Sequence, residues 1–353
     1  MHIGVAVLGF AHGHVGMYCS EWRAHPELGV RVLAGWDHEV ARLEKATAEH
    51  GLRACATVEE LLAGPDVQAV VIGAETAYHA DLVERVAQAG KAIVLQKPIA
   101  LTLAEADRIV AAVQRHGVPF TLAWQMRVDP QNLQMRALVQ SGVLGRPFMV
   151  RRRHGLNLHL WPSYADLWHV RPELNRDIWA DDASHAVDFI HWLLGVPEAV
   201  TAEIASLYDP RVPMDNGVAV YRYAGGPLAE VCCSFTCPAG ENTTEIVCER
   251  GVIVQNYGDL VSCNVPRPEG ACGLKWYSQD SKSWTCSDIP TPAQHGARIR
   301  GLAAPLAEFL QGRRGPIATA EEGRTTLRMT LAGHLATREG RRVRIDDEGI
   351  ARI

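Results

Sequence analysis

The sequence predicts an α/β protein of two domains, and two patterns support this fold class. Up to about residue 123, short apolar runs alternate with segments of helical periodicity, which is typical of a parallel sheet with crossover helices. Beyond residue 199, strand-like runs follow one another without helices, as in an antiparallel sheet. We therefore predict a parallel-sheet domain at residues 1–123. A C-terminal α/β domain with a large, mainly antiparallel open sheet is predicted at residues 124–353.

The elements of the first domain are predicted from apolar periodicity and from helix-end signals. Thr102 precedes a helical segment and Glu105 follows three residues later, which is the pattern of a capping box. Gly51, Gly90 and Gly117 stand where helix C-caps are expected. The predicted strands are residues 3–8, 30–36, 69–72, 92–95 and 119–124, and the predicted helices are residues 15–24, 40–50, 58–63, 80–89 and 103–116.

The second domain has a different order of helical and strand-like segments. It begins with a short helical segment and a strand, and then an irregular, aromatic-rich stretch precedes a longer helix. Successive strands follow, and two further helices close the chain. The predicted helices are residues 133–140, 182–194, 296–311 and 320–338, and the predicted strands are residues 148–154, 199–208, 217–223, 228–236, 243–248 and 252–257.

Composition excludes several classes of protein. The 353 residues carry a formal net charge of −5, which gives no reason to expect nucleic acid, since proteins that bind it usually carry a basic face. No apolar run approaches the ~18 residues that a membrane span requires. The first strand is too short for the apolar core of a signal peptide. We expect a cytoplasmic protein without nucleic-acid or membrane partners.

The cysteines do not predict a metal site or disulfides. There are nine, an odd number, and no two form a Cys-x-x-Cys pair. Small buried thiols explain them best. A site built from His154, His159 and His169 is conceivable, but this spacing fits no metal signature. No metal ligands are predicted.

A glycine-containing turn after the first strand resembles the dinucleotide-binding fingerprint of Rossmann domains. The three glycine positions of that fingerprint are Gly9, Ala11 and His14 here, so the large side chain of His14 must be accommodated. Asp37 closes the second strand, where a carboxylate binds ribose hydroxyls and favours NAD. It lies further from Gly9 than the usual ~20 residues, so the first helix or its exit must be extended. His38 keeps NADP possible.

A lysine and an acid–histidine pair are the candidate catalytic groups. Lys97 follows a buried strand, and ligands of open α/β sheets bind at the carboxyl ends of the strands. On the predicted helix, Asp181 and Asp182 lie one turn before His185. His185 suits a base that removes a hydroxyl proton, and Lys97 suits a cation that orients the oxygen. Asp181 either supports His185 or binds a substrate hydroxyl. An aspartate and a histidine one helical turn apart also occur on solvent-exposed helix faces without any catalytic role.

The aromatic-rich stretch suits a carbohydrate, because aromatic rings pack against sugar faces while polar groups bind hydroxyls. Packed loops contain the same residue types, so a structural role is the alternative for each of them. Arg153 and His154 are neighbours on a strand and point to opposite faces, so only one can reach a ligand.

These motifs together resemble the Gfo/Idh/MocA family of oxidoreductases over nearly the whole chain. Gln96-Lys97-Pro98 is similar to the family's Glu-Lys-Pro motif, and His79 stands where the family has a histidine after Thr-Pro. Arg127 and Pro130 match its Arg-Phe-x-Pro segment, and residues 181–188 match Asp-x-x-x-His-x-x-Asp. The chain departs from the pattern at Gln96, which replaces a glutamate, at Ala77, which replaces a proline, and at His14.

The resemblance implies an N-terminal Rossmann domain and an NAD(P)-dependent enzyme acting on a ring carbon of a sugar, sugar derivative or cyclitol. It also implies a homodimer or homotetramer. The catalytic residues are then Lys97, His185 and Asp181. Cofactor contacts are expected from Gly9, Ala11, His12, His14, Asp37, His38, Thr76, His79, Gln96 and Lys97. Substrate contacts are expected from Arg127, His154, His159, Trp161, Trp179, Asp181 and Asp182.

Two other functions remain open at this point. An enzyme with tightly bound NAD would oxidise a glycoside transiently and catalyse elimination or epimerisation without net redox change. A non-catalytic dinucleotide-binding sensor is the other alternative, favoured by the altered fingerprint and by Gln96 and opposed by the presence of Lys97 and His185.

Overall fold

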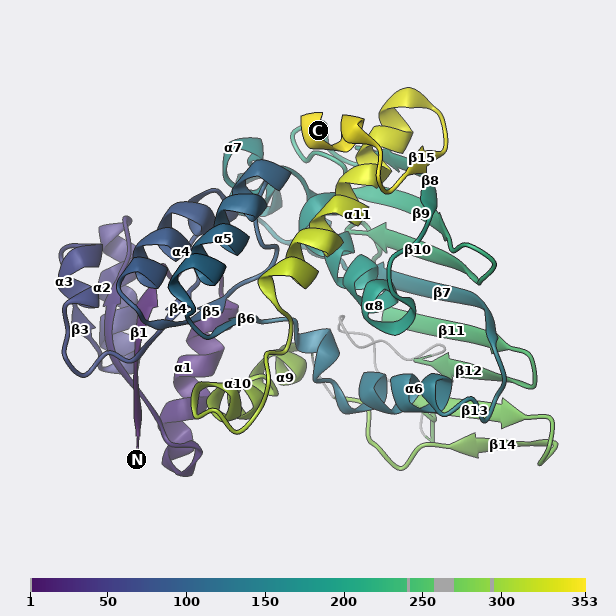
Figure 1. Ribbon diagram of the computed structural model, residues 1–353, viewed down its shortest axis with the longest axis horizontal. Coiled ribbons are helices and arrows are strands. Elements are labelled where there is room, and N and C mark those ends of the chain that lie inside the picture. Colours follow the sequence, from purple (N-terminus) through teal and green to yellow (C-terminus); the bar gives the residue numbers. More distant parts are fainter. Residues whose placement is uncertain (1, 240–241, 257–269, 293–294) are drawn as a thin grey trace. The chain divides into compact units, whose positions relative to one another are not determined.

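The computed structural model describes residues 2–239, 242–256, 270–292 and 295–353, and it divides into two compact units (Figure 1). The first unit contains Met1–Val128 together with Gly296–Arg324, and the second contains Asp129–His295 and Thr325–Ile353. The first unit is therefore not the continuous segment 1–123 that the sequence predicts, because residues 296–324 return to it. Cys263, one of the nine cysteines, lies outside the described residues.

The first unit is built on a parallel sheet. In its described residues six strands lie in the order β3-β2-β1-β4-β5-β6, which is the strand order of a Rossmann domain. The strands are β1 (Ile3–Leu8), β2 (Val30–Trp36), β3 (Arg53–Ala54), β4 (Ala69–Ile72), β5 (Ala92–Leu95) and β6 (Phe120–Leu122). Four of the five predicted strands have their predicted limits. The two exposed residues of β3 carry no apolar pattern, so the sequence did not predict this strand.

Helices connect these strands, and some of them begin and end at the predicted capping residues. α1 (His14–Ala24) contacts α2 (Val40–His50), and α4 (His79–Gln88) contacts α5 (Leu103–His116). α3 (Val58–Leu62) is short. Thr102 and Glu105 form the predicted capping box. A 3₁₀ helix at Pro26–Leu28 extends the connection to β2, which explains the late position of Asp37.

Residues 296–324 pack into the first unit through both backbone and side-chain contacts. The predicted helix 296–311 is divided into α9 (His295–Arg300) and α10 (Ala303–Leu310). The indole nitrogen of Trp22 on α1 donates to the Ala303 carbonyl at 2.9 Å. The Leu122 N–H of β6 donates to the Ala318 carbonyl at 2.9 Å. These long-range contacts join the segment to the parallel sheet.

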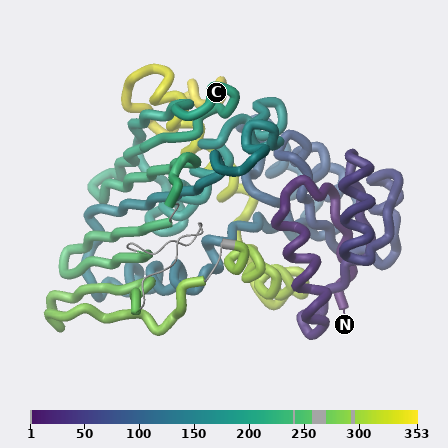
Figure 2. The backbone as a smooth tube through the Cα atoms, turned by 180° about the vertical axis from the view of Figure 1, so that it is seen from behind, coloured from purple at the N-terminus to yellow at the C-terminus, as the bar shows by residue number. Residues whose placement is uncertain are grey.

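The second unit contains a mixed, mostly antiparallel sheet with β7 in its middle (Figures 1 and 2). Its described residues form nine strands in the order β14-β13-β12-β11-β7-β10-β9-β8-β15. Among the described pairs, β7 and β10 are parallel and the others are antiparallel. The strands are β7 (Pro147–Gly155), β8 (Ala199–Ala205), β9 (Asn216–Arg222), β10 (Leu228–Ser234), β11 (Asn242–Cys248), β12 (Gly251–Gln255), β13 (Leu274–Ser278), β14 (Ser283–Cys286) and β15 (Val343–Arg344).

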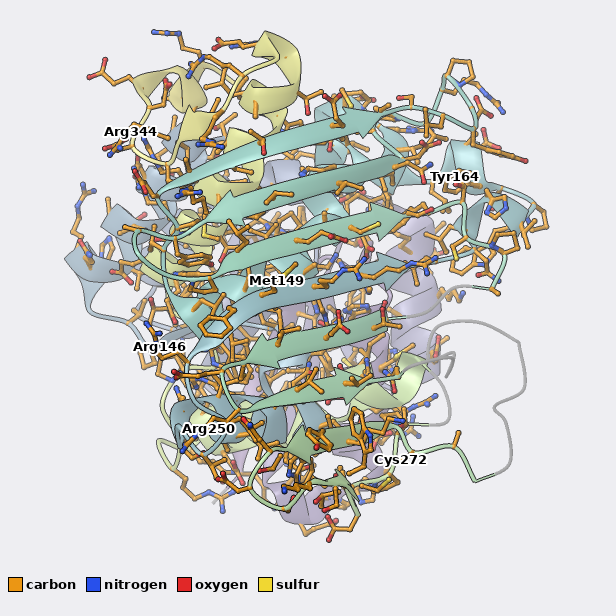
Figure 3. All side chains as sticks on the ribbon, turned by 90° about the vertical axis from the view of Figure 1, so that its right-hand side faces the viewer. Arg146, Met149, Tyr164, Arg250, Cys272 and Arg344 are labelled. Atoms are coloured by element: carbon orange, nitrogen blue, oxygen red, sulfur yellow. The ribbon has the colours of Figure 1, made fainter. Side chains whose placement is uncertain are left out.

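Helices of the second unit pack on one face of this sheet. α8 (Ser184–Leu194) contacts β7 and β10, and a π-helical turn at Trp179–Ala183 precedes it. The other helices are α6 (Pro130–Gln140), α7 (Pro172–Asn175) and α11 (Ala320–Glu339). 3₁₀ helices of this unit lie at Leu158–Leu160, Tyr164–Asp166, Trp168–Val170 and Glu348–Arg352, and two more in the first unit lie at Thr76–Tyr78 and Gln125–Arg127. Figure 3 shows the opposite face of the sheet, which carries Met149 and which no helix of the described residues covers.

In the part of the chain that the structure describes, no helix combines the length and the apolar character that a membrane span requires.

Candidate active site

The turn after β1 has the close backbone approach of a dinucleotide-binding loop. Gly9 has a φ of +86°, and a Cβ built there would lie 2.4 Å from the Cα of Ala74. A Cβ on Gly73 would lie 2.3 Å from Val15 Cγ2, so Gly73 provides the close packing of strand against α1. Gly13 precedes α1 and is exposed, and a Cβ there would meet nothing within 4 Å. An anion such as a pyrophosphate fits at this helix N-terminus.

His14 is accommodated beside a second imidazole. Its ring centroid lies 4.2 Å from that of His12 in an edge-on arrangement. His12 is buried and His14 is half-buried. Because Gly73 supplies the close helix–strand contact, a glycine is not required at position 14. The same rings flank the loop that the sequence assigns to the cofactor.

Asp37 is the centre of a polar network at the carboxyl end of β2. Its carboxylate accepts from the N–H groups of Phe10 at 2.7 Å and Glu39 at 2.8 Å, and from Arg42 Nη2 at 2.9 Å. Arg42 Nη1 also donates to Glu75 Oε1 at 2.8 Å. Arg42 thus bridges two buried carboxylates. This network holds Asp37 in place, and it brings a guanidinium close to the carboxylate that would meet the adenosine ribose.

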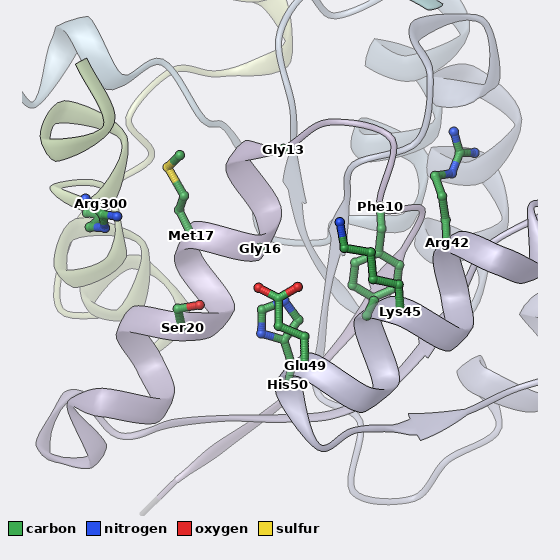
Figure 4. Close-up of a pocket in the computed structure, with 11 residues that line it drawn as sticks. Phe10, Gly13, Gly16, Met17, Ser20, Arg42, Lys45, Glu49, His50 and Arg300 are labelled. Atoms are coloured by element: carbon green, nitrogen blue, oxygen red, sulfur yellow. The ribbon is translucent and has the colours of Figure 1, made fainter. Parts of the chain in front are cut away.

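A pocket of about 480 Å³ lies beside this network but extends away from it along α1 and α2 (Figure 4). Gly16 borders it on α1 and Gly13 directly before that helix, and Lys45 and His50 border it on α2. The pocket follows the helices rather than the carboxyl edge of the sheet, where a dinucleotide is expected. Most of this pocket therefore lies outside the site that we assign to the cofactor, which it meets at Gly13 and Arg42.

Lys97 follows β5 and is buried, with 4% of its surface exposed. Its backbone N–H donates to Gln96 Oε1 at 3.3 Å, and Gln96 Nε2 donates to the Tyr18 hydroxyl at 2.6 Å. The side-chain amide of Gln96 is fully buried, and it hydrogen-bonds both to the backbone after β5 and to Tyr18 on α1. A neutral side chain fits here, since a carboxylate would be desolvated beside the phenol.

His79 links two loops at the carboxyl edge of the sheet. Its Nδ1 lies 3.0 Å from the Pro98 carbonyl, and its Nε2 lies 3.2 Å from the Ala74 carbonyl. Burial lowers the pKa of His79 to about 4. The imidazole is therefore neutral at pH 7, and its single N–H donates to one of these carbonyls while the ring packs against the other. The side chain thus lies between the loop behind Gly9 and the loop that carries Lys97.

The pKa of His79 leads to a prediction about acid stability. Between the ordinary value of 6.5 and about 4, the unfolded chain binds a proton at His79 that the folded chain does not. Folding stability from this group is complete above pH 6.5 and is lost as the pH falls towards 4, by about 3 kcal/mol at most. In urea unfolding from pH 7 to pH 4, His79→Gln should lose less stability than the wild type. His116→Gln, at an exposed position, should follow the wild type, and identical pH profiles for all three proteins would contradict this reading.

Asp181 and Asp182 lie in the π-helical turn and His185 lies in the first turn of α8. The sequence placed all three on one regular helix, so this local geometry is a correction. Asp177 organises the turn: its Oδ1 accepts from the Ala180 N–H at 2.7 Å, and its Oδ2 lies 2.8 Å from Nε2 of His334 on α11. π-helical turns often occur at functional sites. The sequence did not single out Asp177, because its partner is distant in the chain.

Asp181 and His185 are buried within the second unit, each 3% exposed, and a second acid–imidazole pair lies beside them. His154 Nδ1 on β7 is 2.6 Å from Asp182 Oδ2, and the ring centroids of His154 and His185 are 5.5 Å apart. Cys233 on β10 contacts Asp182 Oδ2 at 3.6 Å. Burial, with a smaller contribution from Asp182, raises the pKa of this thiol. Cys233 is a site residue that no local pattern in the sequence indicates.

The remaining predicted substrate residues have different surroundings. Arg127 is buried in the first unit, and its Nη1 pairs with Glu322 Oε1 at 2.7 Å. Trp179 has no exposed surface and packs against Gly217, so the structure gives it a core position. His159 Nδ1 lies 3.2 Å from the Phe235 carbonyl. Trp161 is half exposed.

Other predicted cofactor residues gather in the first unit. Thr76 is buried at the start of a 3₁₀ helix, and the ring centroid of His38 lies 4.9 Å from that of Tyr78. Together with the turn at Gly9 and the network around Asp37, they surround the carboxyl edge of a Rossmann sheet. These residues fit a dinucleotide. Lys97 follows β5 at the same edge.

A Rossmann sheet with a dinucleotide turn, joined in one chain to a mixed-sheet unit with buried acids and imidazoles, defines a dinucleotide-dependent oxidoreductase. Family models bear this out. Residues 3–123 match the oxidoreductase family with the NAD-binding Rossmann fold, and residues 132–254 match the GFO/IDH/MocA C-terminal domain. The chain belongs to the Gfo/Idh/MocA family of NAD-binding oxidoreductases.

Similar proteins and structures span most of the chain. A 1,5-anhydro-D-fructose reductase of Ensifer adhaerens is 25% identical over 87% of this chain and 91% of its own length. Myo-inositol dehydrogenase Hyg17 of Streptomyces leeuwenhoekii is 30% identical over 70% of this chain and 74% of its own. The structure of a levoglucosan dehydrogenase in complex with NADH and levoglucosan has a TM-score of 0.84 at 17% identity, covering 98% of this chain and 100% of that one.

Proposed function

We propose that this protein transfers a hydride between NAD and a ring carbon of a sugar, sugar derivative or cyclitol. The observation that carries the proposal is the burial of Asp181 and His185 together, beside further acid and imidazole groups, in a chain whose other unit binds a dinucleotide. Titratable groups are costly to bury, and active sites are one of the places where proteins gather them. The names of the relatives support a carbohydrate or cyclitol as substrate.

In the proposed mechanism, NAD supplies the hydride acceptor when it is bound, and the chain supplies the proton chemistry. His185 accepts the proton of the reacting hydroxyl as the carbonyl forms. Lys97 supplies an ammonium, the group that stabilises the negative charge developing on the reacting oxygen. Asp181 positions the substrate or the imidazole. In the reverse direction the same groups return the proton to the carbonyl oxygen.

The proposal is tested by a substrate panel monitored at the NADH absorbance. Myo-inositol, levoglucosan and common hexoses are offered with NAD, and 1,5-anhydro-D-fructose is offered with NADH. We expect turnover with at least one ring compound. Titration of NAD by tryptophan fluorescence shows in parallel whether cofactor binds. NAD binding without turnover on any substrate would contradict the proposal and favour a dinucleotide sensor.

Asp37→Ala should weaken NAD binding and shift preference towards NADP. A hydrogen bond to a charged group contributes about 1.5–3 kcal/mol, so the Kd for NAD should rise by roughly tenfold or more. The Kd for NADP should change less, because Arg42 remains and the carboxylate that repels a 2′-phosphate is gone. Tryptophan fluorescence measures both constants. Glu39→Ala, which keeps the N–H group bound to Asp37, is the matched control. Equal weakening of NAD and NADP would contradict a ribose role.

We propose that the uncovered face of the mixed sheet binds a second copy of the chain. Met149, Val218, Val220 and Leu228 expose their apolar side chains on this face, between 37% and 43% of each residue. Their strands are neighbours, with Leu228 paired to Met149. Light scattering after gel filtration should give the mass of a dimer or tetramer. A monomer at micromolar concentration would contradict this assembly.

A further inference from the structure

Three donor groups of different chemistry converge at one buried point of the second unit. They are the imidazole of His154 on β7, the carboxylate of Asp182 in the π-helical turn and the thiol of Cys233 on β10. Their donor atoms all lie within 4.8 Å of one another, and all three residues are buried. The topology explains the convergence: β7 and β10 are parallel neighbours, His154 pairs with Cys233, and the π-helical turn lies against β10.

The imidazole of His154 is the member of this triad that lacks a complete set of hydrogen bonds. His154 Nδ1 lies 2.6 Å from Asp182 Oδ2, yet neither ring nitrogen of His154 has a hydrogen bond of acceptable geometry to a described residue. The residue is 1% exposed. Buried polar groups normally have partners. A short contact between a ring nitrogen and a carboxylate oxygen requires something between the two atoms that both bind, either the hydrogen of the imidazole N–H or a metal ion.

The separations fit tetrahedral coordination after a small adjustment. Zinc–ligand distances of about 2.1 Å to nitrogen and oxygen and about 2.3 Å to sulfur imply separations of about 3.6 Å for sulfur–oxygen and about 3.4 Å for nitrogen–oxygen. Cys233 Sγ already lies 3.6 Å from Asp182 Oδ2. Nδ1 of His154 and Oδ2 of Asp182 are 2.6 Å apart. They would have to move apart by roughly 0.8 Å to reach the nitrogen–oxygen separation of a zinc site. This is within reach of a side-chain rotation.

We propose that His154, Asp182 and Cys233 bind one divalent transition-metal ion of the zinc class. Thiolate and imidazole favour Zn²⁺ and Co²⁺ over Mg²⁺ and Ca²⁺, which prefer oxygen ligands. Three protein ligands leave one tetrahedral position for an oxygen ligand. The phenol of Tyr164, also buried and without a hydrogen-bond partner among the described residues, belongs to the same unit. The sequence predicted no metal, since these three residues are far apart in the chain and match no ligand spacing.

Cobalt titration tests the site without any substrate, so its outcome is independent of the proposed function. Full-length protein treated with a chelator and desalted is titrated with Co²⁺ and monitored in the visible and near-ultraviolet. We expect one equivalent to bind, with d–d bands of tetrahedral cobalt and a thiolate-to-cobalt charge-transfer band, and Zn²⁺ should displace it. Cys233→Ser should abolish the charge-transfer band and weaken binding by more than the roughly 10–100-fold that follows loss of an outer-sphere partner.

Cys232→Ser is the matched control, because Cys232 is the neighbouring thiol on β10, half-buried on the opposite face of the strand. It should titrate as the wild type does. Asp182→Asn and His154→Gln should weaken cobalt binding as Cys233→Ser does, and circular dichroism checks that each variant is folded. Absence of the charge-transfer band in folded wild-type protein would overturn the proposal. A band that survives in Cys233→Ser, or disappears in Cys232→Ser, would overturn it equally.

Discussion

Replacing His185 with glutamine should lower kcat for oxidation by about 10²–10⁴-fold, the contribution typical of a positioned general base. Glutamine keeps a polar side chain of similar length but cannot accept a proton at neutral pH. His185 is buried in the first turn of α8, so its loss removes a group fixed by packing. NAD affinity should stay unchanged, because the dinucleotide network belongs to the first unit.

His191→Gln is the control for this variant. His191 lies on the same helix, and its Nδ1 is 3.0 Å from the Thr326 hydroxyl, which in turn donates to Asp188 at 3.2 Å. This network is structural, so His191→Gln should alter thermal stability more than kcat. Steady-state kinetics with a substrate from the panel distinguishes a catalytic role of His185 from a structural role. A His185→Gln enzyme with wild-type kcat would exclude His185 as the base.

Replacing Lys97 with methionine should lower kcat by about 10²–10³-fold, the loss that follows removal of one group stabilising a developing oxyanion. Methionine retains most of the aliphatic stem and removes the charge. Lys97 is buried, so the variant also removes the cost of desolvating an ammonium. We therefore expect the folded state to survive, with a melting temperature close to that of the wild type.

Lys91→Met is the matched control for Lys97→Met. Lys91 is half-buried and directly precedes β5, at the opposite end of the strand from Lys97. Its replacement should leave kcat unaffected while making the same change of charge and volume. Equal kinetic losses in the two variants would show that net charge or strand stability, and not contact with the reacting oxygen, explains the effect.

The sequence predicted the first unit better than the second for a physical reason. β1, β4 and β5 are continuous apolar runs because helices bury both of their faces, and such runs are visible without any alignment. β2 is apolar apart from the exposed Arg31. β13 and β14 are mostly half-buried or exposed, so their residues carry a weak pattern. The return of residues 296–324 to the first unit depends on contacts such as that of Trp22 with Ala303, which no local pattern records.

The candidate site was predicted in part. The structure buries Lys97, Asp181 and His185, and their catalytic roles stay predictions. The π-helical turn and its organisation by Asp177 and His334 depend on tertiary contact, as does the pairing of Arg127 with Glu322. Spacing on an ideal helix could not anticipate either.

The most direct test of the account is a double-mutant cycle on Lys97 and His185. The kcat/KM for oxidation of one identified ring substrate is measured for the wild type, Lys97→Met, His185→Gln and the double variant. Groups that act on one hydroxyl are strongly non-additive, so the double variant should lose less than the product of the single losses by about tenfold or more. Losses that multiply without interaction, or a double variant as active as the wild type, would contradict a shared role in hydride transfer.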